Sequence, residues 1–88
     1  MIEADIKRGK QAEELLDNPL LGEILEGLRQ HYIDEWLASE PSDVQARERL
    51  YLSSRLVDEF RQTLRVAVEN GKITKAILQR KEKRAESL

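Results

Sequence analysis

The longest uninterrupted helical pattern in the chain is DVQARERLYLSSRLVDEFRQTLRVAVE, residues 43–69, which contains neither proline nor glycine. At 1.5 Å per residue, a helix of this length extends about 40 Å. Its apolar arc repeats at close to heptad spacing and consists of Ala46, Leu50, Ser53, Val57, Phe60, Leu64 and Ala67, with Leu56 and Val68 at its margins. This spacing predicts one long helix that serves as an arm of an antiparallel hairpin or as a coiled-coil seam.

The predicted start and end of this helix depend on local signals. Ser42 begins a capping box, because its hydroxyl can accept from the backbone N–H of Gln45, whose side chain can reach back. Asn70-Gly71 predicts the helix end, since glycine adopts the left-handed conformation that closes a helix without a Cβ clash. A short C-terminal helix is then expected over about residues 74–86.

Two further helices are predicted before residue 43. Asn18 is a good N-cap and Pro19 suits the first helical position, so a second helix is expected over about residues 19–38. Its predicted buried face consists of Leu21, Ile24, Leu25, Leu28, Tyr32 and Trp36. A shorter helix over about residues 3–16 carries a weaker stripe of Ile2, Ile6, Gly9, Ala12 and Leu16.

These signals together predict an all-α fold, a long antiparallel helical hairpin with short N- and C-terminal helices, as a single domain over residues 1–88. No strand pattern and no internal repeat is visible. In the last helix, docking is expected of Ile73, Ala76 and Ile77. The basic segment over about residues 79–88 has almost no apolar content and is expected to project or fray.

The sequence also predicts that the domain is oligomeric. A chain of this length buries only about 60–65% of its unfolded surface, and several apolar residues lie off the two main stripes, namely Tyr51, Val44, Val66, Ile33 and Leu37. Such residues cover the terminal helices or another subunit. The predicted oligomer seam consists of Leu50, Val57, Phe60 and Leu64.

The sequence gives little support for catalysis, nucleotide binding or metal binding. Gly22 and Gly27 have the spacing of a phosphate-binding loop, but Leu28-Arg29 follows where lysine and a hydroxyl residue are needed. His31 is the single histidine, so it cannot complete a helical metal site with Asp34 and Glu35 alone. Ser53 and Ser54 lie mid-helix with no histidine at suitable spacing. We therefore expect a protein that is not an enzyme and has no cofactor or metal.

The composition also predicts where in the cell the protein acts. It has no cysteine, no apolar run near the ~20 residues of a membrane span, and no apolar centre in its first ten residues. These features predict a soluble intracellular protein without a membrane partner.

Charge is distributed unevenly along the chain. Residues 1–44 carry 11 acidic and 4 basic side chains, a net charge of −7, whereas residues 45–88 carry 6 and 11, a net charge of +5. The two halves can attract each other within a hairpin or between subunits. Bases are dense after residue 71, and the predicted nucleic-acid contacts are Lys75, Arg80, Lys81, Lys83 and Arg84, with Lys72 beside them. The alternative is that this segment is a solubilising tail.

One set of residues runs through most of the chain, namely Arg8-Gly9-x-x-Ala12-x-x-Leu15-Leu16-x-Asn18-Pro19-Leu20-Leu21, then Trp36, Asp43 with Ala46-Arg47-Glu48-x-Leu50, and Asn70-Gly71-Lys72. In these residues the chain resembles short helical proteins of tailed bacteriophages and prophages. The resemblance covers roughly residues 7–78 and implies a phage origin. In size and helicity the chain is also similar to small terminase subunits, which form rings around a helical oligomerisation core and help the packaging motor engage viral DNA.

The resemblance implies a DNA-packaging factor that assembles as a homo-oligomer in the host cytoplasm or in association with the virion. Two alternatives stay open. One is a structural head or connector component that binds phage proteins and never touches DNA. The other is a host-directed inhibitor whose acidic first half occupies a basic site on a host protein.

Overall fold

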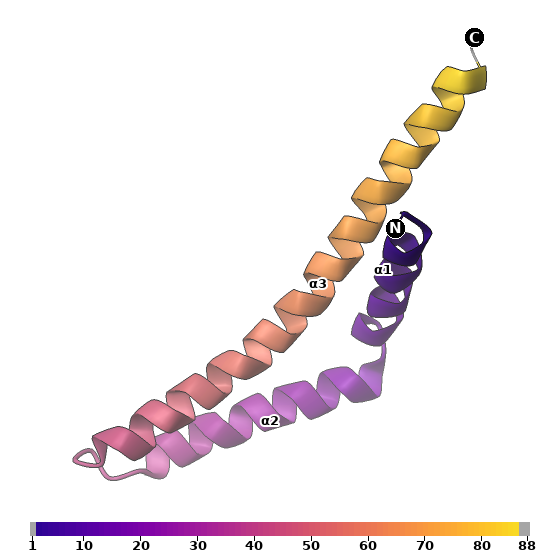
Figure 1. Cartoon of the computed structure of the whole chain (residues 1–88). Coiled ribbons are helices and arrows are strands. Elements are labelled where there is room, and N and C mark those ends of the chain that lie inside the picture. The colour runs from indigo at the N-terminus through magenta and orange to yellow at the C-terminus, as the bar shows by residue number, and fades with distance from the viewer. Residues whose placement is uncertain (1, 87–88) are drawn as a thin grey trace. The chain divides into compact units, whose positions relative to one another are not determined.

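The computed structural model describes residues 2–86 and contains three helices in that range. Helix α1 spans Ile2–Leu16, α2 spans Pro19–Ala38, and α3 spans Val44–Glu86 (Figure 1). No residue between 2 and 86 is in a strand. The predicted all-α fold, in which a long helix packs against shorter ones, is therefore confirmed.

The chain divides into two compact units, and α3 runs through both of them. The hairpin unit comprises residues 18–62, in which α2 lies antiparallel to the first part of α3 (Figure 1). The terminal unit comprises residues 1–17 and 63–88, in which α1 lies antiparallel to the remainder of α3 (Figure 1).

Both helices of the hairpin unit begin at a side-chain cap. Asn18 Oδ1 accepts hydrogen bonds from the backbone N–H groups of Leu20 at 2.9 Å and Leu21 at 3.2 Å, as predicted. At the start of α3 the cap is Asp43, whose Oδ1 accepts from the N–H of Ala46 at 3.2 Å. The predicted start at Ser42 is therefore wrong by one residue. Aspartate caps a helix as well as serine does, and its charge also suits the positive end of the helix dipole.

Residues on both sides of the turn between α2 and α3 stabilise it. Both the backbone N–H and the hydroxyl of Ser39 donate to the carbonyl oxygen of Trp36, at 3.2 and 2.6 Å. The guanidinium of Arg47 lies 4.1 Å from the centre of the Trp36 ring, and its Nη1 donates to Ser39 Oγ at 3.4 Å. A cation over an aromatic face is attracted to it, so Arg47 ties the first turn of α3 to the last turn of α2.

The hairpin unit has a narrow core. Leu25 of α2 and Val57 of α3 are its buried apolar residues. Around them lie half-buried side chains, among them Leu21, Tyr32, Ile33, Ala46, Leu50 and Ser53. The predicted buried face of α2 is therefore only partly correct, because Ile24, Leu28 and Trp36 stand exposed.

The terminal unit is held by a close approach of two glycines. Gly9 of α1 and Gly71 of α3 are both buried, together with Ala12 and Val68. A Cβ added to Gly9 would lie 2.9 Å from Gly71 Cα, so the two backbones touch. Gly71 has no positive φ, and α3 continues through it as regular helix. The predicted helix end at Asn70-Gly71 is wrong, because this glycine provides room for α1 instead of a left-handed cap.

The predicted C-terminal helix is the last part of α3. Continuing the helical rotation from Gly71 places Thr74 and Leu78 on the same side, and both are half-buried. Ile73, Ala76 and Ile77 are exposed instead. The prediction that these three side chains dock is therefore wrong, because the docked side of the helix is rotated away from them by about one residue. Residues 79–86 are helical and exposed throughout. Residues 87–88 of the predicted tail lie outside the described residues.

Candidate interaction surfaces

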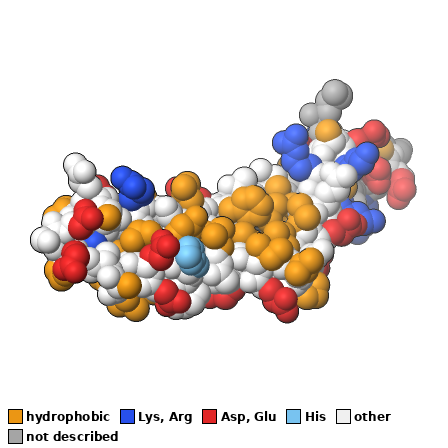
Figure 2. All heavy atoms as spheres, turned by 90° about the horizontal axis from the view of Figure 1, so that it is seen from below, with side chains coloured by type: hydrophobic (Ala, Val, Ile, Leu, Met, Phe, Trp, Pro, Cys, Tyr) orange, Lys and Arg blue, Asp and Glu red, His pale blue; other side chains and the backbone are white. Residues whose placement is uncertain are grey.

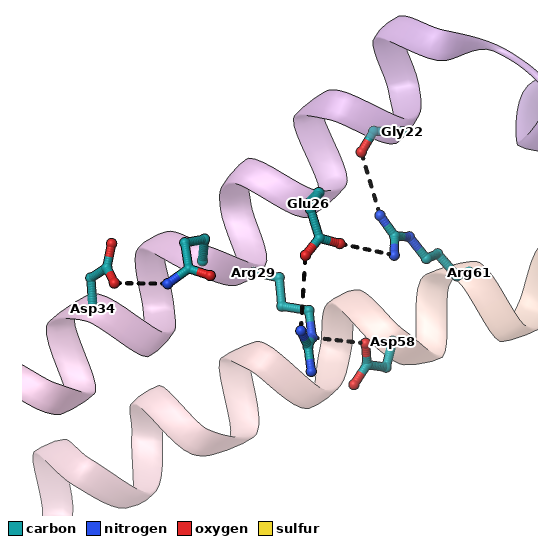
Figure 3. Close-up of polar contacts among 7 residues, drawn as sticks. Gly22, Glu26, Arg29, Asp34, Asp58 and Arg61 are labelled. Atoms are coloured by element: carbon teal, nitrogen blue, oxygen red, sulfur yellow. Dashed lines mark hydrogen bonds and ion pairs between the residues drawn. The ribbon is translucent and has the colours of Figure 1, made fainter.

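Two arginine–carboxylate pairs join α2 to α3 in the hairpin unit. Arg29 Nε of α2 lies 3.3 Å from Asp58 Oδ1 of α3, and Arg61 Nη1 of α3 lies 3.3 Å from Glu26 Oε2 of α2 (Figure 3). Arg61 Nη2 also donates to the carbonyl oxygen of Gly22 at 3.4 Å. The pairs are reciprocal, since each helix contributes one arginine and one carboxylate.

This reciprocity reflects a six-residue pattern that occurs once in each helix. Residues 24–29 read ILEGLR and residues 56–61 read LVDEFR, both of which are two aliphatic residues, an acid, any residue, a large apolar residue and arginine. This repeat was not predicted, because ILEGLR and LVDEFR agree in residue class but are identical only at the final arginine. The two hexapeptides lie antiparallel to each other, which explains why the acid of each one pairs with the arginine of the other.

The same pattern gives the hairpin unit an apolar face, which we define as Ile24 and Leu28 of α2 with Leu56 and Phe60 of α3. In both helices the buried residue, Leu25 or Val57, is followed one and four positions later by the paired acid and arginine. The apolar residues stand one position before and three positions after it. At about 100° per residue they therefore rotate to the side opposite the ion pairs.

The apolar face is open to solvent. Its side chains are exposed by 55% at Ile24, 40% at Leu28, 63% at Leu56 and 49% at Phe60. Figure 2 shows hydrophobic side chains gathered on one face beside the single histidine, His31, drawn in pale blue. A contiguous group of large apolar side chains from two neighbouring helices is typical of a protein-binding surface.

The residues of the predicted seam occupy different environments. Val57 is 4% exposed and packs inside the hairpin unit, while Leu50 and Leu64 are half-buried. Phe60 stands on the apolar face. Of the four predicted seam residues, Phe60 is thus the one whose side chain is available to a partner. Its neighbours on the apolar face are Ile24 and Leu28, which were predicted to be buried, and Leu56, which was predicted to lie at the margin of the apolar arc.

A small apolar hollow lies on the ion-pair side of the hairpin unit, near the turn. It is lined by Tyr32, Ile33, Trp36, Leu50, Tyr51 and Ser54. In the terminal unit a groove has a mixed lining, with Glu13 and Glu14 from α1, Asp17 directly after α1, and Lys72 and Lys75 from α3. The predicted contact Lys75 therefore stands beside acids of its own unit.

The other predicted nucleic-acid contacts lie on the last turns of α3. Arg80, Lys81, Lys83 and Arg84 are all exposed, and helical rotation spreads them over an arc of about 160°. Lys83 and Arg84 belong to the last turn of α3, where cations are favoured by the negative end of the helix dipole. This end of α3 is suited to electrostatic contact with an anion.

The residues considered for catalysis or metal binding are engaged in local contacts. His31 Nε2 lies 3.3 Å from Glu35 Oε1, whereas Asp34 Oδ1 accepts from Gln30 Nε2 at 2.8 Å, so Asp34 is engaged with a different neighbour. The hydroxyls of Ser53 and Ser54 donate to backbone carbonyls at 2.8 and 2.7 Å. No group of three or more His, Cys, Asp or Glu residues positioned for a metal ion occurs within residues 2–86.

Nor does any helix among the described residues combine the length and apolarity needed to cross a membrane. Comparison of the chain with family models, with curated proteins and with solved structures found no match.

Proposed function

We propose that the chain is a non-enzymatic assembly protein, which self-associates and in that state binds another macromolecule. The observation that carries this proposal is the small core. The buried apolar residues within residues 2–86 are Ala12, Leu25, Val57 and Val68, and no side chain there is fully buried. A large part of the apolar surface is left in water, and its burial by another chain is a strong driving force for association.

The mass in solution tests this proposal. We expect light scattering at tens of micromolar to give a multiple of the chain mass of 10.2 kDa. The thermal midpoint followed by circular dichroism should rise with protein concentration, because association stabilises the folded state by mass action. A mass of 10.2 kDa and a midpoint independent of concentration would contradict self-association.

In its specific form, we propose a phage DNA-packaging role similar to that of small terminase subunits. The exposed basic end of α3 favours it, because Arg80, Lys81 and Lys83 can neutralise phosphates of the DNA backbone. Several copies in one assembly would present several such ends to one duplex, which raises the effective affinity.

Salt-dependent DNA binding tests the packaging role. Fluorescence anisotropy with a labelled duplex should give an affinity that falls steeply between 50 and 200 mM salt, as expected for contacts to several phosphates. Replacing Lys81 and Lys83 with glutamine should weaken binding and reduce the salt dependence. Replacing Lys7 and Lys10 of α1 with glutamine is the matched control for the loss of two charges. An oligomer that binds no DNA would instead support a head or connector component, and a monomer that binds no DNA a host-directed inhibitor.

A further inference from the structure

We propose that the apolar face of the hairpin unit, Ile24, Leu28, Leu56 and Phe60, receives the same face of a second copy, so that two hairpins form a four-helix bundle. This inference rests on the proposed self-association and names the surface that performs it. Each copy contributes α2 and the first part of α3.

The face is self-complementary because of the repeated pattern. Each helix supplies an aliphatic residue one position before its buried residue and a large apolar residue three positions after it. A two-fold axis between two copies therefore brings side chains of similar size together whichever helix lies opposite. Such a contact is closed, since the same surface is used on both copies.

The dimensions of the hairpin unit also suit a dimer. A 20-residue helix is about 30 Å long and two adjacent helices are about 20 Å wide, so the whole side of the hairpin unit that carries the apolar face measures about 600 Å² per copy. Two such faces bury about 1,200 Å² in total, the lower end of the range of stable interfaces. The opposite side of the hairpin already carries the ion pairs Arg29–Asp58 and Glu26–Arg61, so its charges are paired within the chain.

Charge selects which helices face each other across the interface. Helix α2 carries four acids against one arginine, whereas residues 44–62 of α3 carry four arginines against three acids. Two copies are therefore expected to place α2 of one opposite α3 of the other, where Glu35 of one copy approaches Arg49 of the second. Both residues are exposed.

Matched substitutions on the two sides of the hairpin test the face. Phe60→Glu places a charge on the apolar face, and Tyr51→Glu places the same charge on the ion-pair side of α3, at a residue of similar exposure, 57% against 49%. At equal helix content by circular dichroism, we expect the mass of the Phe60→Glu protein to fall by at least half while Tyr51→Glu keeps the wild-type mass. An unchanged mass for Phe60→Glu, or an equal loss for both variants, overturns the proposal.

Single cysteines provide a second test that leaves the fold nearly unperturbed, because the chain has no cysteine of its own. We expect an equimolar mixture of Leu28→Cys and Leu56→Cys proteins to be joined by a short bismaleimide in higher yield than a mixture of Leu37→Cys and Tyr51→Cys proteins, whose cysteines lie on the ion-pair side. Equal yields overturn the proposed face. Equal yields from an oligomer leave the proposed self-association intact, whereas a monomeric wild-type chain overturns both.

Discussion

Gly9 of α1 and Gly71 of α3 face each other where the backbones of the two helices of the terminal unit come into contact. A Cβ on Gly9 would lie 2.9 Å from Gly71 Cα, and a Cβ on Gly71 would lie 3.0 Å from Gly9 Cα and 3.1 Å from the carbonyl oxygen of Asp5. The atoms that would be met belong to the backbone, so they cannot move aside as a flexible side chain could. Each glycine therefore makes room for the other helix.

Gly71→Ala is expected to destabilise the protein although alanine is the better helix former. Alanine gains about 1 kcal/mol over glycine inside a helix, but overpacking of a close contact costs typically about 1–3 kcal/mol. We expect a net loss in the free energy of unfolding, measured by urea denaturation, and faster amide hydrogen exchange in α1. Gly9→Ala should behave in the same way, since its Cβ would also lie 2.9 Å from the carbonyl oxygen of Ala67.

Gly27→Ala is the matched control for these substitutions. A Cβ at Gly27 would meet no atom within 4 Å, so the substitution should raise stability by up to about 1 kcal/mol. If Gly71→Ala stabilises the protein as Gly27→Ala does, then α1 does not pack on Gly71 as closely as described.

These glycines show where prediction from sequence fails. Asn70-Gly71 has the form of a helix end, and nothing nearby in the sequence distinguishes a left-handed cap from a packing contact. The residue that decides between them is Gly9, which is 62 positions away. Local signals worked where both partners are local, as in the cap formed by Asn18 and Pro19.

Asp43→Ala is expected to cost about 1 kcal/mol of stability, because loss of an N-cap side chain leaves a backbone N–H of the first turn without its acceptor. Here the acceptor is Asp43 Oδ1 and the donor is Ala46 N. Ser42→Ala should change the free energy of unfolding by a few tenths of a kcal/mol at most. Chemical denaturation of both variants checks this, and a larger effect at Ser42 would restore the capping box predicted from the sequence.

Leu25→Ala is expected to cost about 2 kcal/mol, near the lower end for a buried leucine, because the narrow core of the hairpin unit leaves its cavity open to solvent. Leu25 is 9% exposed, whereas Leu37 on the same helix is 68% exposed. Leu37→Ala should therefore change stability little. Urea denaturation of the two variants makes the comparison, and equal losses would show that α2 packs on α3 with a different face.

The apolar face was only partly predictable from the sequence. Rotation of α2 placed Ile24, Leu25 and Leu28 together on one predicted buried face, but the width of the stripe does not say how much of it one neighbour covers. A single helix packs against the part around Leu25, so Ile24 and Leu28 stay exposed. On α3 the heptad spacing joined Val57 and Phe60 into one seam, although the neighbouring helix buries the first of them and leaves the second in water.

The two ion pairs of the hairpin unit are expected to have small coupling energies of similar size. A double-mutant cycle with Glu26→Gln and Arg61→Gln should give a coupling energy of about 0.2–1 kcal/mol, since an ion pair that keeps one partner in contact with water gains little. The same cycle for Arg29 and Asp58 should give a similar value, because both pairs have a distance of 3.3 Å. Raising the salt concentration should reduce both couplings. Zero coupling in one pair and a strong coupling in the other would contradict the equivalence of the two six-residue patterns. Reversing one pair, with Glu26→Arg and Arg61→Glu together, should retain more stability than either reversal alone.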